Sequence, residues 1–186
     1  MATTYKVLLK TDNINTVLAN VNDAPKMTIN KNMVVEVPMT IPAGKNMVLN
    51  MGNKKLSGNQ PLVVNGELQI IGGIIEAQNK AIIVNEGGKL VIDGTKITSS
   101  NSEGIRLEGG ECVFNSGSIE SQEGCFSIYK GAGSKFVINN GTFKARDNAA
   151  VMGNGTRNTG AGYEIVINGG EFDCNIQIGR TSCRER

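Results

Sequence analysis

Apolar and polar residues alternate in short segments along the chain, and these segments recur at a nearly constant interval. The clearest unit runs from Gly87 to Ser99 and reads GGKLVIDGTKITS. Alternation with a period of two predicts β-strands that bury one face. An interval of about 20 to 50 residues is the signature of a solenoid. The apolar residues that lead successive units lie 21 to 29 residues apart: Met47, Leu68, Leu90, Cys112, Phe136 and Ile165.

Each unit contains three such segments, with a Gly- or Asn-rich corner between the first and the second. Glycine and asparagine tolerate the left-handed backbone of a sharp corner. Segments this short pair stably only with equivalent segments of neighbouring coils, so the sequence predicts an all-β parallel β-helix of about six coils. The predicted interior columns are Leu68/Ile70, Leu90/Ile92, Cys112/Phe114, Phe136/Ile138 and Ile165/Ile167; then Ile75, Ile97, Ile119, Phe143 and Phe172; the small residues Ala77, Ser99, Ser121, Ala145 and Cys174; and Leu62/Val64, Ile82/Val84, Ile105/Leu107, Phe126/Ile128 and Ala150/Met152.

Outward positions of the first segment form three further columns. The first column alternates between Glu and Lys, and the second consists of one Asp and three Asn residues. Stacked coils favour both patterns, because neighbouring opposite charges attract and side-chain amides form hydrogen-bonded ladders. The third column is apolar, and a contiguous exposed apolar stripe is typical of an interface. We therefore predict it as the seam of a possible homotrimer, with β-propensity alone as the alternative. The columns are Glu67, Lys89, Glu111, Lys135 and Glu164; Asp93, Asn115, Asn139 and Asn168; and Val91, Val113, Val137 and Val166.

The repeat and the lead-in segment IPAGK at residues 41–45 resemble the pectin-lyase-like superfamily, which includes phage-fibre and bacterial surface β-helix proteins. The resemblance covers about residues 33–176. It implies a right-handed single-stranded parallel β-helix. It does not imply one chemistry, because this architecture carries many functions.

The two ends differ from the repeat. Residues 5–9 predict a strand, and the spacing of Ile14, Val17, Leu18 and Val21 predicts a helix after Thr11 or Asp12. We assign residues 1–32 to an N-terminal strand-helix cap or attachment segment and residues 33–177 to the β-helix. Residues 178–186 resemble the translation of a common sequencing adapter, with Thr181 in place of alanine, and we interpret them as non-native.

Composition narrows the function classes. The net charge of +2 carries no basic footprint for nucleic acid, and three Tyr, five Phe and no Trp supply few base-stacking rings. No apolar run is long enough to span a membrane, so we expect no membrane insertion. The N-terminus lacks a signal-peptide pattern, and we expect a virion particle or an extracellular surface as the location.

Candidate catalytic residues are few. Polygalacturonase-like members of the superfamily carry Asp-Asp, Gly-His-Gly and Arg-x-Lys, and this chain has none of the three. Pectate-lyase-like members hold calcium with clustered carboxylates. The carboxylates to test are Glu76, Glu120 and Asp173, with calcium as a cofactor only for a lyase. Two coils separate Glu76 from Glu120, about 9.6 Å, which suits inverting glycosidases and equally suits a solvated charged face.

Other candidates lie in loops and at cysteines. The insertion at residues 153–162 places Arg157 and Asn158 in a loop that is either a binding loop or a neutral turn. Arg146 and Asp147 suggest a loop ion pair. The cysteines at 112, 125 and 174 fall on apolar or small positions of the repeat. They are either free thiols in the core, or two of them form a disulfide. With no histidine and no CxxC, we predict no zinc site.

Three functions remain at this stage. The first is a non-catalytic structural or receptor- or glycan-binding β-helix of a phage fibre or tail- or head-associated protein. The second is a polysaccharide lyase or glycoside hydrolase, or its remnant. The third is a bacterial surface adhesin. A cell-surface polysaccharide is the expected partner of the first.

Overall fold

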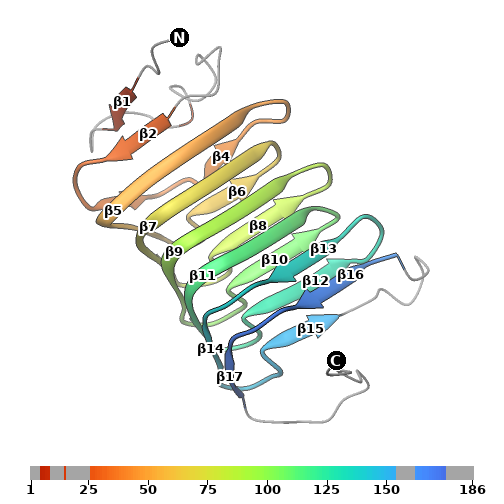
Figure 1. Ribbon diagram of the computed structural model, residues 1–186. Helices are drawn as coiled ribbons and strands as arrows, with labels where there is room; N and C mark the ends of the chain where they lie inside the picture. Colours follow the sequence, from red (N-terminus) through yellow and green to blue (C-terminus); the bar gives the residue numbers. More distant parts are fainter. Residues whose placement is uncertain (1–4, 9–14, 16–25, 154–161, 175–186) are drawn as a thin grey trace.

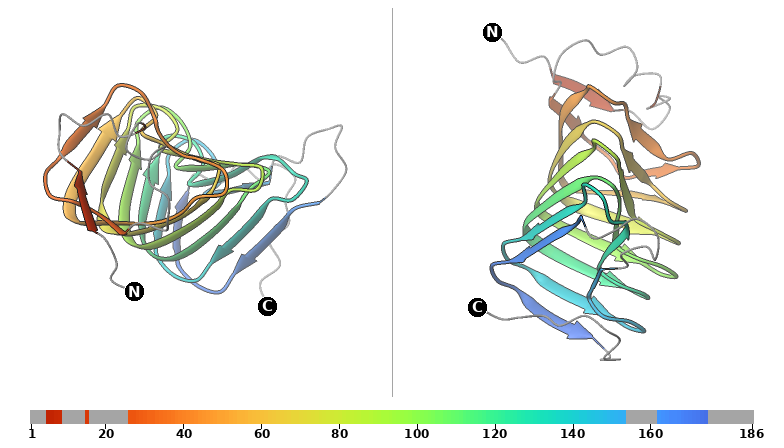
Figure 2. Two further views of the ribbon diagram at one scale, coloured as in Figure 1. Left: turned by 90° about the horizontal axis from the view of Figure 1, so that it is seen from above. Right: turned by 90° about the vertical axis from the view of Figure 1, so that its right-hand side faces the viewer.

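The computed structural model describes residues 5–8, 15, 26–153 and 162–174, and in this part of the chain the protein is an all-β solenoid. Parallel strands stack as a right-handed parallel β-helix of about six turns, as the repeat predicts (Figure 1). The coils lie above one another along the rod, and each complete coil contributes strands to both of two sheets (Figure 2).

The large sheet contains the longer strands. Its continuous path is β1 (Tyr5–Leu8), β2 (Lys26–Ile29), β5 (Asn46–Gly58), β7 (Glu67–Ala77), β9 (Lys89–Ser99), β11 (Glu111–Ser121), β13 (Lys135–Ile138) and β16 (Glu164–Ile167). Three strands join it beside this path: β3 (Met33–Val35), β14 (Thr142–Ala145) and β17 (Glu171–Cys174). The predicted first and second segments are one continuous strand in β5, β7, β9 and β11, and separate strands in the last two coils.

The small sheet closes the coils on their other side. Its order is β15 (Val151–Gly153), β12 (Phe126–Lys130), β10 (Ile105–Glu108), β8 (Ile82–Asn85), β6 (Leu62–Val64) and β4 (Met39–Ile41). Every strand pairing in both sheets is parallel.

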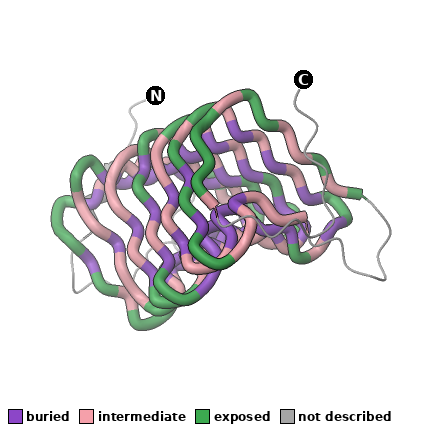
Figure 3. The backbone as a smooth tube through the Cα atoms, turned by 90° about the horizontal axis from the view of Figure 1, so that it is seen from below, coloured by how far each residue is buried: buried purple, intermediate pink, exposed green. Residues whose placement is uncertain are grey.

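The interior columns confirm most of the predicted register. Leu68 pairs with Leu90, and Leu90 pairs with Cys112, so all three lie in one rung column. Buried positions alternate with exposed or partly exposed positions along most of β7 and β9, and the backbone shows the same alternation in the central coils (Figure 3). The core between the sheets is one continuous cluster, because each coil covers the apolar face of its neighbour, and it ends at the last coil, where Ile167 and Phe172 are exposed.

The register predicted for the last coil of the small sheet is wrong by one residue. Phe126 pairs with Val151 and Ile128 pairs with Gly153, whereas the repeat placed Ala150 and Met152 there. A Cβ at Gly153 would lie 2.8 Å from the Tyr163 hydroxyl oxygen, so the Tyr163 ring packs where a side chain of the strand would otherwise lie. Gly153 and Tyr163 are both only partly buried, and the Tyr163 ring packs against the edge of the core.

The N-terminal strand prediction is confirmed by β1, which pairs with β2. Because β2 pairs in turn with β5, strands of the large sheet begin before residue 33. The predicted helix lies outside the described residues except for Asn15. The Asn15 side chain donates to the Pro38 carbonyl at 3.1 Å and accepts from the Thr40 N–H at 2.9 Å, which attaches this residue to the first strand of the small sheet.

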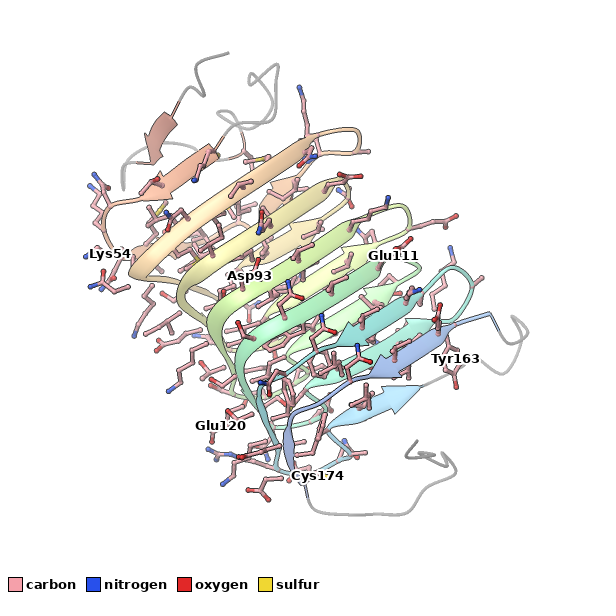
Figure 4. The ribbon with its side chains drawn as sticks, in the orientation of Figure 1. Lys54, Asp93, Glu111, Glu120, Tyr163 and Cys174 are labelled. Carbon is pink, nitrogen blue, oxygen red and sulfur yellow. The ribbon has the colours of Figure 1, made fainter. Side chains whose placement is uncertain are left out.

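The glycine corner divides the outer surface of the large sheet into two parts. We call the outward side before the corner the first face, represented by Glu67, Gln69 and Ile71 of β7. The outward side after the corner, represented by Ile74 and Glu76, is the second face. Glu111 and Glu120, at opposite ends of β11, mark one face each (Figure 4).

Candidate functional site

The three candidate carboxylates lie in one column on the second face. Strand register aligns Glu76 with Thr98, Thr98 with Glu120, Glu120 with Lys144, and Lys144 with Asp173. Two rungs therefore separate each carboxylate from the next, about 9.6 Å at the usual strand spacing. The predicted alignment is confirmed, with a threonine and a lysine between the carboxylates.

Each of these carboxylates forms an ion pair. Glu76 Oε1 lies 2.7 Å from Lys55 Nζ, and Glu120 Oε1 lies 2.7 Å from the Arg146 Nη2 that donates to it. Asp173 Oδ2 lies 3.5 Å from Lys144 Nζ. Each of the three acids therefore lies beside a cation.

Electrostatics at Glu120 oppose a role as a general acid. The hydrogen bond from Arg146 lowers the pKa of Glu120, and the positive charges of Arg146, Lys144 and Lys96 act in the same direction against a smaller opposing effect of burial. A glycosidase acid needs a raised pKa so that it carries a proton near neutral pH. Glu120 instead offers an ionised hydrogen-bond acceptor.

The three candidate carboxylates line two separate shallow hollows. The first has a volume of about 390 Å³, and its lining includes Lys96, Glu120, Lys144, Glu171 and Asp173. The second has a volume of about 440 Å³ and contains Glu76 with Glu36 and Gln78. The structure thus brings Glu120 and Asp173 to one open hollow and leaves Glu76 in another.

The ion pair predicted between Arg146 and Asp147 is wrong. Arg146 reaches back one coil to Glu120, and Asp147 accepts a hydrogen bond of 2.6 Å from the side chain of Gln122. A long side chain in a solenoid has partners one rung away that are closer than its chain neighbour. The predicted loop residues Arg157 and Asn158 lie outside the described residues.

The cysteines at 112, 125 and 174 are free thiols, so the structure holds no disulfide among them. Cys112 and Cys125 are buried, as their interior positions predict. Burial raises the pKa of the Cys112 thiol well above its usual range and raises the pKa of Cys125 to about 12. Among the described residues, no group of three or more Cys, Asp or Glu side chains is placed to hold a metal ion.

A charged cluster beside the small sheet was not found from the sequence. The Arg106 guanidinium carbon lies 3.9 Å from the centre of the Tyr129 ring, and Arg106 Nε lies 3.8 Å from Glu103 and 3.3 Å from Glu108. Glu103 is buried and accepts a hydrogen bond from Ser102. A register shift between β10 and β12 leaves Tyr129 unpaired and 46% exposed. The alternation pattern carries no signal for such a shift.

Strand register confirms the predicted charged and valine columns of the first face, and side-chain hydrogen bonds confirm the column of Asp93, Asn115, Asn139 and Asn168. Gln69, Val91, Val113, Val137 and Val166 align from rung to rung, and all five are half-buried. The charged column aligns beside them, with Lys89 3.6 Å from Glu67 and Lys135 2.8 Å from Glu164. A ladder of side-chain amides borders the valines on the other side and is connected by hydrogen bonds at 2.7 to 2.8 Å.

Comparisons of the chain with protein-family models, with curated proteins and with solved structures found no match. The described residues contain no helix that is long and apolar enough to cross a membrane.

Proposed function

We propose that this chain is a non-catalytic β-helix that acts as a structural, receptor-binding or glycan-binding segment of a fibre, such as a phage fibre or a tail- or head-associated protein. The single observation that supports it is the ion pairing of Glu76, Glu120 and Asp173 with Lys55, Arg146 and Lys144. Catalysis by paired carboxylates requires one carboxyl group that is protonated and acts as the acid, and one carboxylate that is free of an ion-pair partner and acts as the base.

The remaining surface suits binding better than bond cleavage. Polar and charged side chains repeat along the rod at each rung, so a long ligand such as a polysaccharide would meet similar groups several times. Repeated weak contacts raise overall affinity without any deep pocket. The relation to the pectin-lyase-like superfamily, the cell-surface polysaccharide partner and the surface adhesin stay predictions. The homotrimer also stays a prediction, as the alternative to the association of two copies that is proposed below.

One experiment separates binding from cleavage. The purified chain is incubated with acidic and neutral bacterial polysaccharides, with and without added calcium, and both retention on immobilised polysaccharide and release of shorter sugars are measured. The proposal expects retention of at least one polysaccharide with no sugar release. Sugar release that disappears in the Glu120→Gln or Asp173→Asn variant would replace it with the lyase or hydrolase alternative.

A further inference from the structure

The first face combines an apolar stripe with a charge pattern that is complementary to itself. Outward side chains at the centre of each rung form the stripe, in which Gln69 is the one polar member: Val48, Gln69, Val91, Val113, Val137 and Val166. On one side of this stripe the charges change sign at every rung from Glu67 to Glu164. Half-buried valines stacked in this way leave a flat apolar strip that a second flat sheet could cover.

We propose that two copies of this chain associate through their first faces, antiparallel, about a two-fold axis midway between β9 and β11. A two-fold axis that runs along the strand direction reverses the rod and keeps each column opposite itself. It places Lys89 opposite the second copy's Glu111, and Glu67 opposite the second copy's Lys135. The valine stripe then covers itself, with Val91 opposite the second copy's Val113.

The alternation of charge selects this register. An axis that passes through a rung, for example β9, would place Lys89 opposite the second copy's Lys89 and Glu67 opposite the second copy's Glu111. Like charges at facing positions are destabilising. An axis between β9 and β11 places opposite charges together at the four inner rungs, because neighbouring rungs differ in sign, and it places Glu164 opposite the neutral Asn46 of β5.

Overlap selects the particular pair of rungs. An axis between β9 and β11 superposes all six rungs from β5 to β16, and it brings Val48 opposite the second copy's Val166. An axis between β11 and β13 would leave the rungs of β5 and β7 uncovered. The amide ladder is compatible with the same arrangement, since Asp93 then lies opposite the second copy's Asn115 and no acidic side chain faces another.

The size of the face indicates weak association. Six rungs at about 4.8 Å and five residues at about 3.3 Å define a patch of about 480 Å² per copy. Stable protein interfaces bury about 800 Å² per partner. We therefore expect a reversible dimer whose population depends on protein concentration, as suits lateral contact between neighbouring fibres.

Sedimentation velocity over a concentration series, with the Val113→Asp and Val63→Asp variants, tests the seam. Val63 is the matched control, because it is an outward, half-buried valine of the small sheet. We expect a monomer–dimer equilibrium for the unchanged chain and for Val63→Asp, and association at least about tenfold weaker for Val113→Asp. A monomer at the highest soluble concentration, a trimer, or equal effects of the two variants would overturn the proposal.

Zero-length cross-linking of lysine to glutamate tests the register in the unmodified chain. Glu67 and Lys135 lie three rungs apart within one copy, about 14 Å, which a zero-length reagent does not bridge. In an equal mixture of isotope-labelled and unlabelled protein, we expect mixed-isotope peptides that join Glu67 to Lys135. Dimers that cross-link without this peptide would overturn the antiparallel arrangement.

Discussion

The side-chain amide of Asn139 donates a hydrogen bond of 2.7 Å to the side-chain oxygen of Asn115, although 24 residues separate them. Asn115 donates in the same way to Asp93, and Asn168 donates to Asn139. Asn115 and Asn139 thus each accept from one coil and donate to another. The ladder begins at Gln69, whose amide donates to Asp93 at 2.7 Å. A polar column on the outer surface therefore links five coils.

Removal of a central member should break two of these bonds. We expect Asn139→Ala to lower the free energy of unfolding by about 1 to 2 kcal/mol, because each net hydrogen bond contributes about 1 kcal/mol. Denaturant unfolding followed by circular dichroism measures the change. Ser118→Ala, an outward change outside the ladder on the neighbouring strand β11, is the control. Equal losses in the two variants would show that the ladder adds no stability.

The aromatic cluster in the last coils supports a second prediction. Phe126 lies at the centre, with ring centroids 5.5 Å from Phe114, 5.1 Å from Phe136 and 5.0 Å from Phe143. Phe126 is fully buried, so Phe126→Ala should cost about 3 to 5 kcal/mol. Phe172, 38% exposed and beside Phe143, should cost clearly less when it is changed to alanine. Unfolding curves that rank the two variants in the opposite order would contradict the assignment of the core centre.

The predictability of the fold follows from its geometry. Alternation and the interval between units define which side chains share a column, since every rung repeats the same pleat. The interior columns from Leu68 to Ile165 were predictable for this reason, as were the charged column and the amide ladder. These features depend only on position within the repeat.

Features that depend on long side chains or on insertions were not predictable. Arg146 reaches Glu120 across 26 residues, a choice that side-chain length decides. The Tyr163 ring against Gly153 comes from the residues after the insertion and changes the register of β15. The Tyr129 ring that lies against Arg106 is left unpaired by a register shift between β10 and β12. The interval between repeat units and the alternation within them predict none of these three features.

The ion pair of Glu120 with Arg146 supports a pH-dependent prediction. Because the folded state lowers the pKa of Glu120 from its ordinary 4.5, the pair stabilises the fold above that pH and loses its effect as the pH falls through the lowered value. Both side chains are substantially exposed, so Glu120→Gln should cost less than about 1 kcal/mol at neutral pH.

Thermal unfolding of wild type, Glu120→Gln, Arg146→Gln and the double variant at several pH values measures this coupling. The difference between wild type and Glu120→Gln should shrink toward strongly acidic pH, where the wild-type carboxyl is also neutral. A difference that stays constant over the whole pH series would mean that packing, and not charge, is lost in the variant.

Thiol reactivity should separate the cysteines of the core from the one at the end of the rod. Burial raises the pKa of Cys125 to about 12, and the pKa of Cys112 rises for the same reason, so neither forms the reactive thiolate near neutral pH. Cys174 is only partly buried. Alkylation of the native protein, located by peptide mass spectrometry, should modify Cys174 before Cys112 and Cys125, which should react only in denaturant. Native labelling of Cys112 as fast as Cys174 would show that the coils open locally.

The corner glycines Gly94 and Gly117 occupy adjacent positions of the repeat, since Gly117 aligns with Thr95, and they differ in how much room an added side chain has. Gly94 has φ of +73°, and no atom lies within 4 Å of an added Cβ, so Gly94→Ala should cost only the left-handed backbone strain of about 1 to 2 kcal/mol. Gly117 has φ of +128°, and its Cβ would overlap the Thr95 carbonyl oxygen of the neighbouring coil. Gly117→Ala therefore adds a steric clash between backbones to the strain and should cost more than about 3 kcal/mol.

Denaturant midpoints of the two alanine variants test this difference, and Gly94→Asn provides a third point. Asparagine adopts the left-handed region more readily than alanine, so Gly94→Asn should recover part of the stability lost in Gly94→Ala. The same change at Gly117 should recover nothing, because the overlap with Thr95 involves the Cβ that both residues carry. Equal losses at the two glycines would mean that coil spacing at the corner adjusts to admit a side chain, and that stacking of coils there is looser than the strand register requires.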